Sequence, residues 1–253
     1  MELPLKQTLN PPSHNKYITG YHLPFTTLIQ KLTVKLVELK KTGILGLDEF
    51  LRGGLPPSIV LLVGSPEKGH EMFARQVALF RSKKSGVTYF TVTKTQDAIK
   101  ASMAAYGMDT TSLEKEGKWK IVSLPKTLGQ IKTAITNEMK KNRCVVLDSL
   151  SELLLYYDIK KVVDLVNSMI DQNRETQELH FILLTKGMQD SKTEVALQHF
   201  ADCVINFEAS WKSEGLARNL MIQKVLGSTV PTQSIPYSLD KNGLTIETST
   251  RIT

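Results

Sequence analysis

The chain has 253 residues, of which 41% are hydrophobic and 23% charged, and its net charge is +7. This length allows one large α/β domain or two small ones, with a sizeable core. The positive balance permits binding to nucleic acid, an acidic membrane surface or an acidic partner without choosing among them.

The cysteine content and the apolar pattern of the sequence argue against a secreted protein and against a membrane-spanning one. Only Cys144 and Cys203 occur, so the chain is not a disulfide-rich secreted domain. No apolar run approaches the roughly 20 residues of a membrane helix, and the N-terminus lacks the charged-then-apolar layout of a signal peptide. We therefore expect a cytoplasmic protein that does not associate with a membrane.

Residues 1–41 differ in composition from the rest of the chain. Four prolines interrupt this part, and six lysines stand against two glutamates, a surplus of four positive charges. Because proline fixes φ and removes a hydrogen-bond donor, little regular structure is expected in its first part. We predict a basic N-terminal extension over residues 1–41 and one folded domain over residues 42–253. The extension either packs on its own domain or binds a partner or nucleic acid.

From residue 42 onward, strand and helix patterns alternate, and strands cluster at the end. Short β-branched or aromatic runs predict strands, and apolar residues at a period of 3.6 predict helices. This order predicts an α/β fold with a mostly parallel sheet flanked by helices and antiparallel C-terminal strands. In chain order, the predicted elements are a helix at 47–51, a strand at 59–63, a helix ending near residue 83, a strand at 87–93, a helix capped by Thr95, a strand at 120–124, a helix at 128–141, a strand at 144–150, a helix at 159–172, a strand at 181–185, a helix at 194–200, and strands at 203–207, 220–225 and 244–247.

The strand at 59–63 leads into a loop with a glycine at each end, Gly64 and Gly69, and a helical pattern follows. This is the layout of a phosphate-binding P-loop. Its motif, G-x-x-x-x-G-K-[ST], continues with a lysine for the β/γ-phosphates and a hydroxyl for Mg²⁺. This chain has His70 and Glu71 at those two positions. The loop and the helix start still offer free N–H groups and the positive end of a helix dipole.

The side chains at these two positions weaken the predicted phosphate site. His70 is shorter than lysine and largely neutral at pH 7. Glu71 places a negative charge beside the phosphates. At roughly 4 Å and an effective dielectric near 20, an unpaired charge costs about 4 kcal/mol, or about three decades of affinity. Lys68 is long enough to swing in instead, which leaves weak ATP binding open as an alternative.

One carboxylate that the site needs is present. Asp148 follows an apolar strand and has the form of a Walker B aspartate. A carboxylate at the C-terminal tip of a parallel strand lies where ligands bind in open α/β sheets. Asp148 is equally placed to cap residues 149–155, and this alternative stays open.

A general base, by contrast, is missing from its expected place. A hydrolase needs a group that activates or positions the attacking water. After the strand near residue 92 come Thr93 and Lys94, and no carboxylate follows until Asp97. We therefore predict that the chain has no catalytic residue.

Six segments of the chain carry recognisable motifs, namely 42–49, 53–56, 146–152, 183–185, 200–205 and 223–227. Together with the loop after residue 63 they resemble the KaiC-like branch of the RecA superfamily, which includes the RadA-like recombinase paralogues. The resemblance covers about residues 42–247 and implies a RecA-like P-loop fold with an ATP site.

The chain departs from this family at three catalytic elements. Family members have Lys-Thr where this chain has His70 and Glu71. They usually carry a Glu pair, which provides the base, where this chain has Thr-Lys. They often carry a Lys and an Arg that reach a neighbouring subunit's γ-phosphate, and this chain keeps Lys224 but has Leu226 in place of the Arg.

We therefore predict a catalytically silent KaiC-like protein, a pseudo-ATPase rather than an enzyme, that acts as a binding or regulatory subunit. It would have no cofactor and no metal site, and would assemble with itself, a paralogue or another protein partner. Two alternatives stay open: a single-stranded DNA-binding recombination accessory protein, and a slow ATPase in which His70 and Lys68 replace the missing lysine. The predicted vestigial nucleotide site comprises Gly64, Lys68, Gly69, His70, Glu71, Asp148 and Lys224.

Overall fold

The chain divides into two units, residues 1–36 and Val37–Thr253. Everything that the computed structural model describes belongs to the second unit. Most of the predicted N-terminal extension lies outside the described residues, so the extension and the single-stranded DNA hypothesis stay predictions. The described residues are 38–66, 68–213, 215–227 and 234–247.

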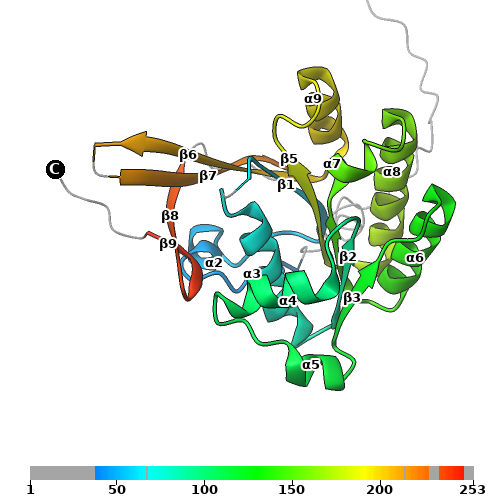
Figure 1. Cartoon of the computed structure of the whole chain (residues 1–253), viewed down its shortest axis with the longest axis horizontal. Helices are drawn as coiled ribbons and strands as arrows, with labels where there is room; N and C mark the ends of the chain where they lie inside the picture. The colour runs from blue at the N-terminus through cyan, green and yellow to red at the C-terminus, as the bar shows by residue number, and fades with distance from the viewer. Residues whose placement is uncertain (1–37, 67, 214, 228–233, 248–253) are drawn as a thin grey trace, which may run out of the picture. The chain divides into compact units, whose positions relative to one another are not determined.

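A nine-stranded sheet forms the centre of the second unit (Figure 1). Its strand order is β3-β2-β4-β5-β1-β6-β7-β8-β9. The strands from β3 to β6 in this order run parallel, and β7, β8 and β9 continue the sheet antiparallel. The predicted α/β fold, with a mostly parallel sheet and antiparallel C-terminal strands, is confirmed. The strands are β1 (Ser58–Gly64), β2 (Val87–Thr91), β3 (Trp119–Ser123), β4 (Cys144–Asp148), β5 (Leu179–Thr185), β6 (Cys203–Lys212), β7 (Gly215–Val225), β8 (Ile235–Asp240) and β9 (Gly243–Ile246).

Helices cover both faces of the parallel part of the sheet. In β1, Val60 and Leu62 belong to the core shared with α3, whereas Ile59, Leu61 and Val63 belong to the core shared with α6 and α8. A strand buried on both faces reads as a continuous apolar run, which made β1 predictable. None of the described helices is long and apolar enough to span a bilayer. The helices among the described residues are α2 (Leu47–Phe50), α3 (His70–Ser82), α4 (Gln96–Ala104), α5 (Thr111–Lys115), α6 (Leu128–Lys140), α7 (Leu150–Leu153), α8 (Ile159–Thr176) and α9 (Ser191–Phe200).

The structure adds three elements to those predicted and lengthens two strands. The short helices α5 and α7 are only five and four residues long, and β8 contains Pro236, a residue that argues against a strand. Strands β6 and β7 continue past their predicted ends because they pair with each other as a hairpin, as far as Lys212 opposite Gly215. This outer part of the hairpin lies beyond the last residue of β1 that pairs with β6.

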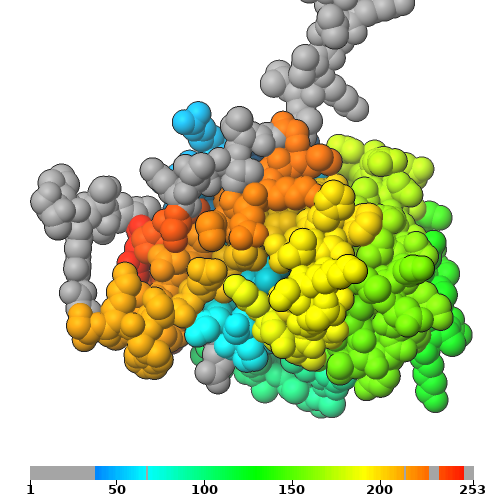
Figure 2. Space-filling model, turned by 90° about the horizontal axis from the view of Figure 1, so that it is seen from above, coloured from blue at the N-terminus to red at the C-terminus, as the bar shows by residue number. Residues whose placement is uncertain are grey.

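The tips of the parallel strands meet at one edge of the sheet, and this edge positions the site. Strands β2 and β4 pair so that Thr91 lies opposite Asp148, and Gly64 ends β1. The loop after β1 leads into α3. The buried ion pair Arg81–Glu178 joins the last turn of this helix to the residue that precedes β5. In Figure 2 this loop, in cyan, reaches the surface beside the orange β6–β7 segment and the yellow α9.

Candidate functional site

The loop between β1 and α3 presents the start of α3 at the sheet edge. Gly69 is the N-cap with φ of 92°, a left-handed conformation that favours glycine. The N–H of Phe73 donates to the carbonyl of Gly69 at 2.8 Å, so the N–H groups of residues 70–72 have no acceptor within the helix. Gly64 is required for another reason, because a Cβ there would lie 2.6 Å from Nδ1 of His70.

His70 does not supply the charge of a P-loop lysine. The residue is only 2% exposed, and its ring lies close to Gly64 and 6.3 Å from the ring of Phe207, measured between centroids. Burial lowers the pKa of His70 below its ordinary value, so the imidazole is neutral at pH 7. Its Nδ1 has no hydrogen-bond partner among the described residues.

Glu71 is held in two ion pairs. Arg75, one turn later on α3, lies 3.1 Å from Oε2 of Glu71, and Nζ of Lys94 lies 3.1 Å from Oε1. Burial of the carboxyl opposes ionisation, but the charges of Lys94 and Arg75 hold the pKa of Glu71 below its ordinary value. The repulsion expected from Glu71 assumed an unpaired carboxylate, and the two neighbouring cations offset that charge.

Three side chains contact the carboxylate of Asp148. Its Oδ2 accepts a hydrogen bond from the hydroxyl of Tyr89 at 2.6 Å. The amine of Lys94 donates to both carboxylate oxygens, at 3.1 and 3.3 Å, and Arg75 lies 3.7 Å away. The alternative that Asp148 caps the next helix is wrong, because the N-cap of α7 is Ser149. The carboxylate of Asp148 therefore faces the site.

Glu152, on α7, brings a carboxylate to a place where none was expected. Its Oε1 accepts a hydrogen bond from the hydroxyl of Thr93 at 2.9 Å, and its Oε2 is buried without a partner in the described part of the chain. Burial raises the pKa of Glu152, and the negative charges of Asp148 and Glu71 raise it further. The sequence indicated no carboxylate between residues 92 and 97, and the one beside Thr93 comes instead from the segment after a neighbouring strand, β4.

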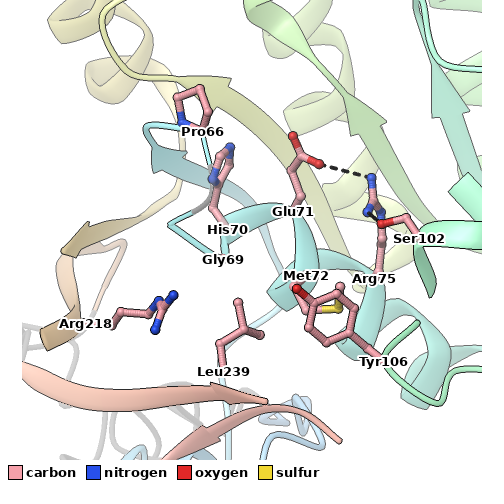
Figure 3. A pocket seen from close by; sticks show the side chains of 10 residues that line it. All are labelled: Pro66, Gly69, His70, Glu71, Met72, Arg75, Ser102, Tyr106, Arg218 and Leu239. Atoms are coloured by element: carbon pink, nitrogen blue, oxygen red, sulfur yellow. Dashed lines mark hydrogen bonds and ion pairs between the residues drawn. The ribbon is translucent and has the colours of Figure 1, made fainter. Parts of the chain in front are cut away.

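A cavity of about 530 Å³ lies beside the start of α3 (Figure 3). Gly69, His70 and Glu71 line it from the loop and helix, and Figure 3 shows the side chains of Arg218 and Leu239 near Gly69. Nε of Arg218 is buried and has no partner among the residues described. The cavity therefore combines the start of a helix, two arginines and apolar side chains. Its lining residues are Pro66, Gly69, His70, Glu71, Met72, Arg75, Ser102, Tyr106, Arg218 and Leu239.

Two of the predicted site residues lie elsewhere. Lys68 lines a separate cavity together with Lys186 and Glu208. Lys224 donates from its amine to the backbone carbonyl of His199 at 2.5 Å. The other five predicted residues lie together at the sheet edge. In the described part of the chain, no group of three or more His, Cys, Asp or Glu side chains could hold a metal ion.

Sequence reasoning missed five residues of the site, and two of them carried a local signal. Arg75 stands four residues after Glu71, the spacing of a helical ion pair. Glu152 stands three residues after the N-cap of α7, as in a capping box. Tyr89, Lys94 and Arg218 carried no signal, because strand pairing brings their segments to the site.

The parallel sheet, the glycine-bounded loop from β1 into α3 and the aspartate at the tip of β4 define a RecA-like P-loop domain. A family model described as "ATPase: KaiC" matches residues 40–251, and the chain therefore belongs to the KaiC ATPase family. The fold is similar to the crystal structure of KaiC-like protein PH0186 from Pyrococcus horikoshii OT3. That similarity has a TM-score of 0.72 at 23% sequence identity and covers 83% of this chain and 99% of the other.

Two relatives have similar lengths. A UPF0273 protein of Aeropyrum pernix is 26% identical over 240 residues, which cover 83% of this chain and 94% of the relative. A UPF0273 protein of Thermotoga maritima is 26% identical over 240 residues, with coverage of 83% and 96%.

Membership of an ATPase family overturns the prediction that this protein is not an enzyme. That prediction weighed only the side chains at the motif positions. It did not include Glu152, which lies outside those positions and reaches Thr93 from the segment after β4. It also treated Glu71 as an unpaired charge, whereas two cations neutralise it.

Proposed function

We propose that the protein is a slow ATPase that acts as a regulatory subunit. Its family, the free N–H groups at the start of α3 and the cavity beside them support nucleotide binding. The observation that carries the proposal is Glu152, whose buried Oε2 has no partner among the described residues. This carboxylate gives the site a group that accepts a proton.

Glu152 is the general base of the proposed reaction. It takes a proton from water while the water oxygen attacks the γ-phosphorus of ATP, and the bond from that phosphorus to the β–γ bridging oxygen breaks. ADP leaves with the electron pair of the broken bond, and the proton is later released to solvent. The raised pKa of Glu152 suits this role, because a base is most effective when its pKa lies nearer the operating pH.

Positive groups from three segments of the chain balance the phosphate charge in this proposal. They are the N–H groups of α3, the guanidinium of Arg218 in the cavity and the amine of Lys94 beside Asp148. The Mg²⁺ ion that P-loop ATPases use does not fit the residues present, because Lys94 lies between the two side chains that would hold it. No step is therefore assigned to Mg²⁺.

The ion pairs give a reason to expect slow turnover. Lys94 and Arg75 each contact both Glu71 and Asp148. These ion pairs must be broken before either side chain can bind a phosphate. A subunit that hydrolyses ATP slowly stays in its ATP-bound state for longer. Such a subunit is suited to signal its nucleotide state to a protein partner.

Hydrolysis of γ-labelled ATP by the full chain tests the proposal. The wild-type protein should release phosphate above background, and Glu152→Gln should lower the rate by about 10²–10⁴-fold, the usual contribution of a general base. Glu175→Gln, at an exposed position on α8, is the matched control and should retain the wild-type rate. Equal rates for Glu152→Gln and the wild type, or no turnover by the wild type, would refute the proposal.

A further inference from the structure

The ammonium group of Lys94 lies between the carboxylates of Glu71 and Asp148. Its Nζ is 3.1 Å from Oε1 of Glu71 and 3.1 Å from Oδ2 of Asp148. Glu71 stands at the P-loop position whose hydroxyl binds Mg²⁺ in P-loop ATPases, and Asp148 stands at the Walker B position. One positive charge of the protein therefore lies between the two groups that would flank the metal.

Local contacts hold the segment that carries this amine. The hydroxyl of Thr91 donates to the backbone carbonyl of Lys94 at 2.9 Å, and the next residue, Thr95, caps α4. Burial of the amine opposes its charge, but Asp148 and Glu71 outweigh this effect and raise the pKa of Lys94. The amine is therefore charged at neutral pH.

A divalent cation does not fit this arrangement. Mg²⁺ requires about six oxygen ligands at about 2.0–2.1 Å in near-octahedral geometry. Oδ2 of Asp148 already accepts from Tyr89 at 2.6 Å and from Lys94 at 3.1 Å. The charges of Glu71 and Asp148 are also balanced by those of Lys94 and Arg75, so these two carboxylates together present little net negative charge to a metal.

We propose that Lys94 is a built-in cation that replaces the divalent metal, and that this chain binds ATP as a metal-free anion. The inference that ATP binds without a metal rests on the proposed function. The inference that Lys94 takes the place of a metal between Glu71 and Asp148 does not. Removal of the Lys94 amine leaves two carboxylates facing one space and creates a divalent-cation site.

The first experiment measures Mn²⁺ binding to the full chain without nucleotide, from the electron paramagnetic resonance signal of free Mn²⁺. Lys94→Ala should bind Mn²⁺ at least about tenfold more tightly than the wild type. Lys94→Gln, a neutral variant closer in length, should show the same gain, and Lys94→Arg, which keeps the charge, should show none. Lys100→Ala is the matched control, because it removes an ion pair with Glu114 on the neighbouring helix, and it should also show none.

The second experiment measures ATP binding by calorimetry, in EDTA and in excess Mg²⁺. The wild-type affinity should differ by less than about twofold between the two conditions, whereas that of Lys94→Ala should fall at least about tenfold in EDTA. Circular dichroism verifies that each variant is folded.

The outcomes separate this inference from the proposed function. Loss of wild-type ATP binding in EDTA overturns the inference, as does Mn²⁺ binding that neither Lys94→Ala nor Lys94→Gln increases. If the wild type binds no ATP in either condition, the proposed function fails. The Mn²⁺ experiment then decides the assignment of Lys94 by itself.

Discussion

Replacing Arg81 with methionine should lower the free energy of unfolding by about 3–5 kcal/mol. Nη2 of Arg81 lies 2.5 and 2.6 Å from the two carboxylate oxygens of Glu178, and both residues are buried. Without the guanidinium, a buried carboxylate keeps its desolvation cost and loses its counter-charge. Because Arg81 lies in the last turn of α3, the loss also weakens the contact that joins this helix to β5.

Urea unfolding measures this loss, followed by tryptophan fluorescence, which changes on unfolding because Trp119 is buried in the folded protein. Arg174→Met is the matched control. It removes an exposed ion pair with Asp171 at 3.1 Å, and exposed pairs contribute only about 0–1 kcal/mol. Adding Glu178→Gln to Arg81→Met should restore part of the stability, because the unpaired charge is removed. A loss in Arg81→Met no larger than that in Arg174→Met would contradict the prediction.

Acidification should destabilise the wild type more than the His180→Asn variant, by about 1.4 kcal/mol for each pH unit below about 6.5. His180 is fully buried on β5, and its Nδ1 accepts a hydrogen bond from the N–H of Val145 at 3.1 Å. Burial, together with the positive charge of Arg81, lowers the pKa of His180 to about 3.

The sign and the pH window follow from the two pKa values of this histidine. The unfolded chain binds a proton as the pH falls through about 6.5, but the folded chain does not bind it until about pH 3. The contribution of His180 to the free energy of unfolding is therefore constant above pH 6.5. It decreases as the pH falls from 6.5 to 3 and does not change further below pH 3.

Urea unfolding at a series of pH values measures the difference in slope. Asparagine at position 180 retains an acceptor for Val145 but does not titrate in this range. His199→Asn, at an exposed position on α9, is the control and should keep the wild-type slope. Equal slopes for the wild type and His180→Asn would show that burial of His180 does not lower its pKa.

Local pattern was enough to predict most of the fold. The apolar run of β1 and the glycines after it indicated a strand, a loop and a helix start within a residue or two of their observed ends. The alternation of strands and helices predicted the parallel sheet. The length of the β6–β7 hairpin was not predictable, because Trp211 and Leu216 are held by pairing with each other rather than by burial.

The candidate site was predicted only in part. Gly64, Gly69 and Asp148 were recognised because loop spacing and a strand tip define them. The contacts of Asp148 with Tyr89 and Lys94 join residues 59 and 54 positions apart. Such pairs leave no periodic pattern in the chain, so the ion pairs of Glu71 and the position of the Glu152 carboxylate beside Thr93 were not foreseen.

The sequence by itself determined the family, the fold class and the side chains at the motif positions, because these depend on hydrophobic period and on short spacings. Only the tertiary structure decided the electrostatics of the site. Coulomb interactions depend on separation in space. The same Glu71 repels phosphate when it is unpaired, and is neutralised when Lys94 and Arg75 each lie 3.1 Å away.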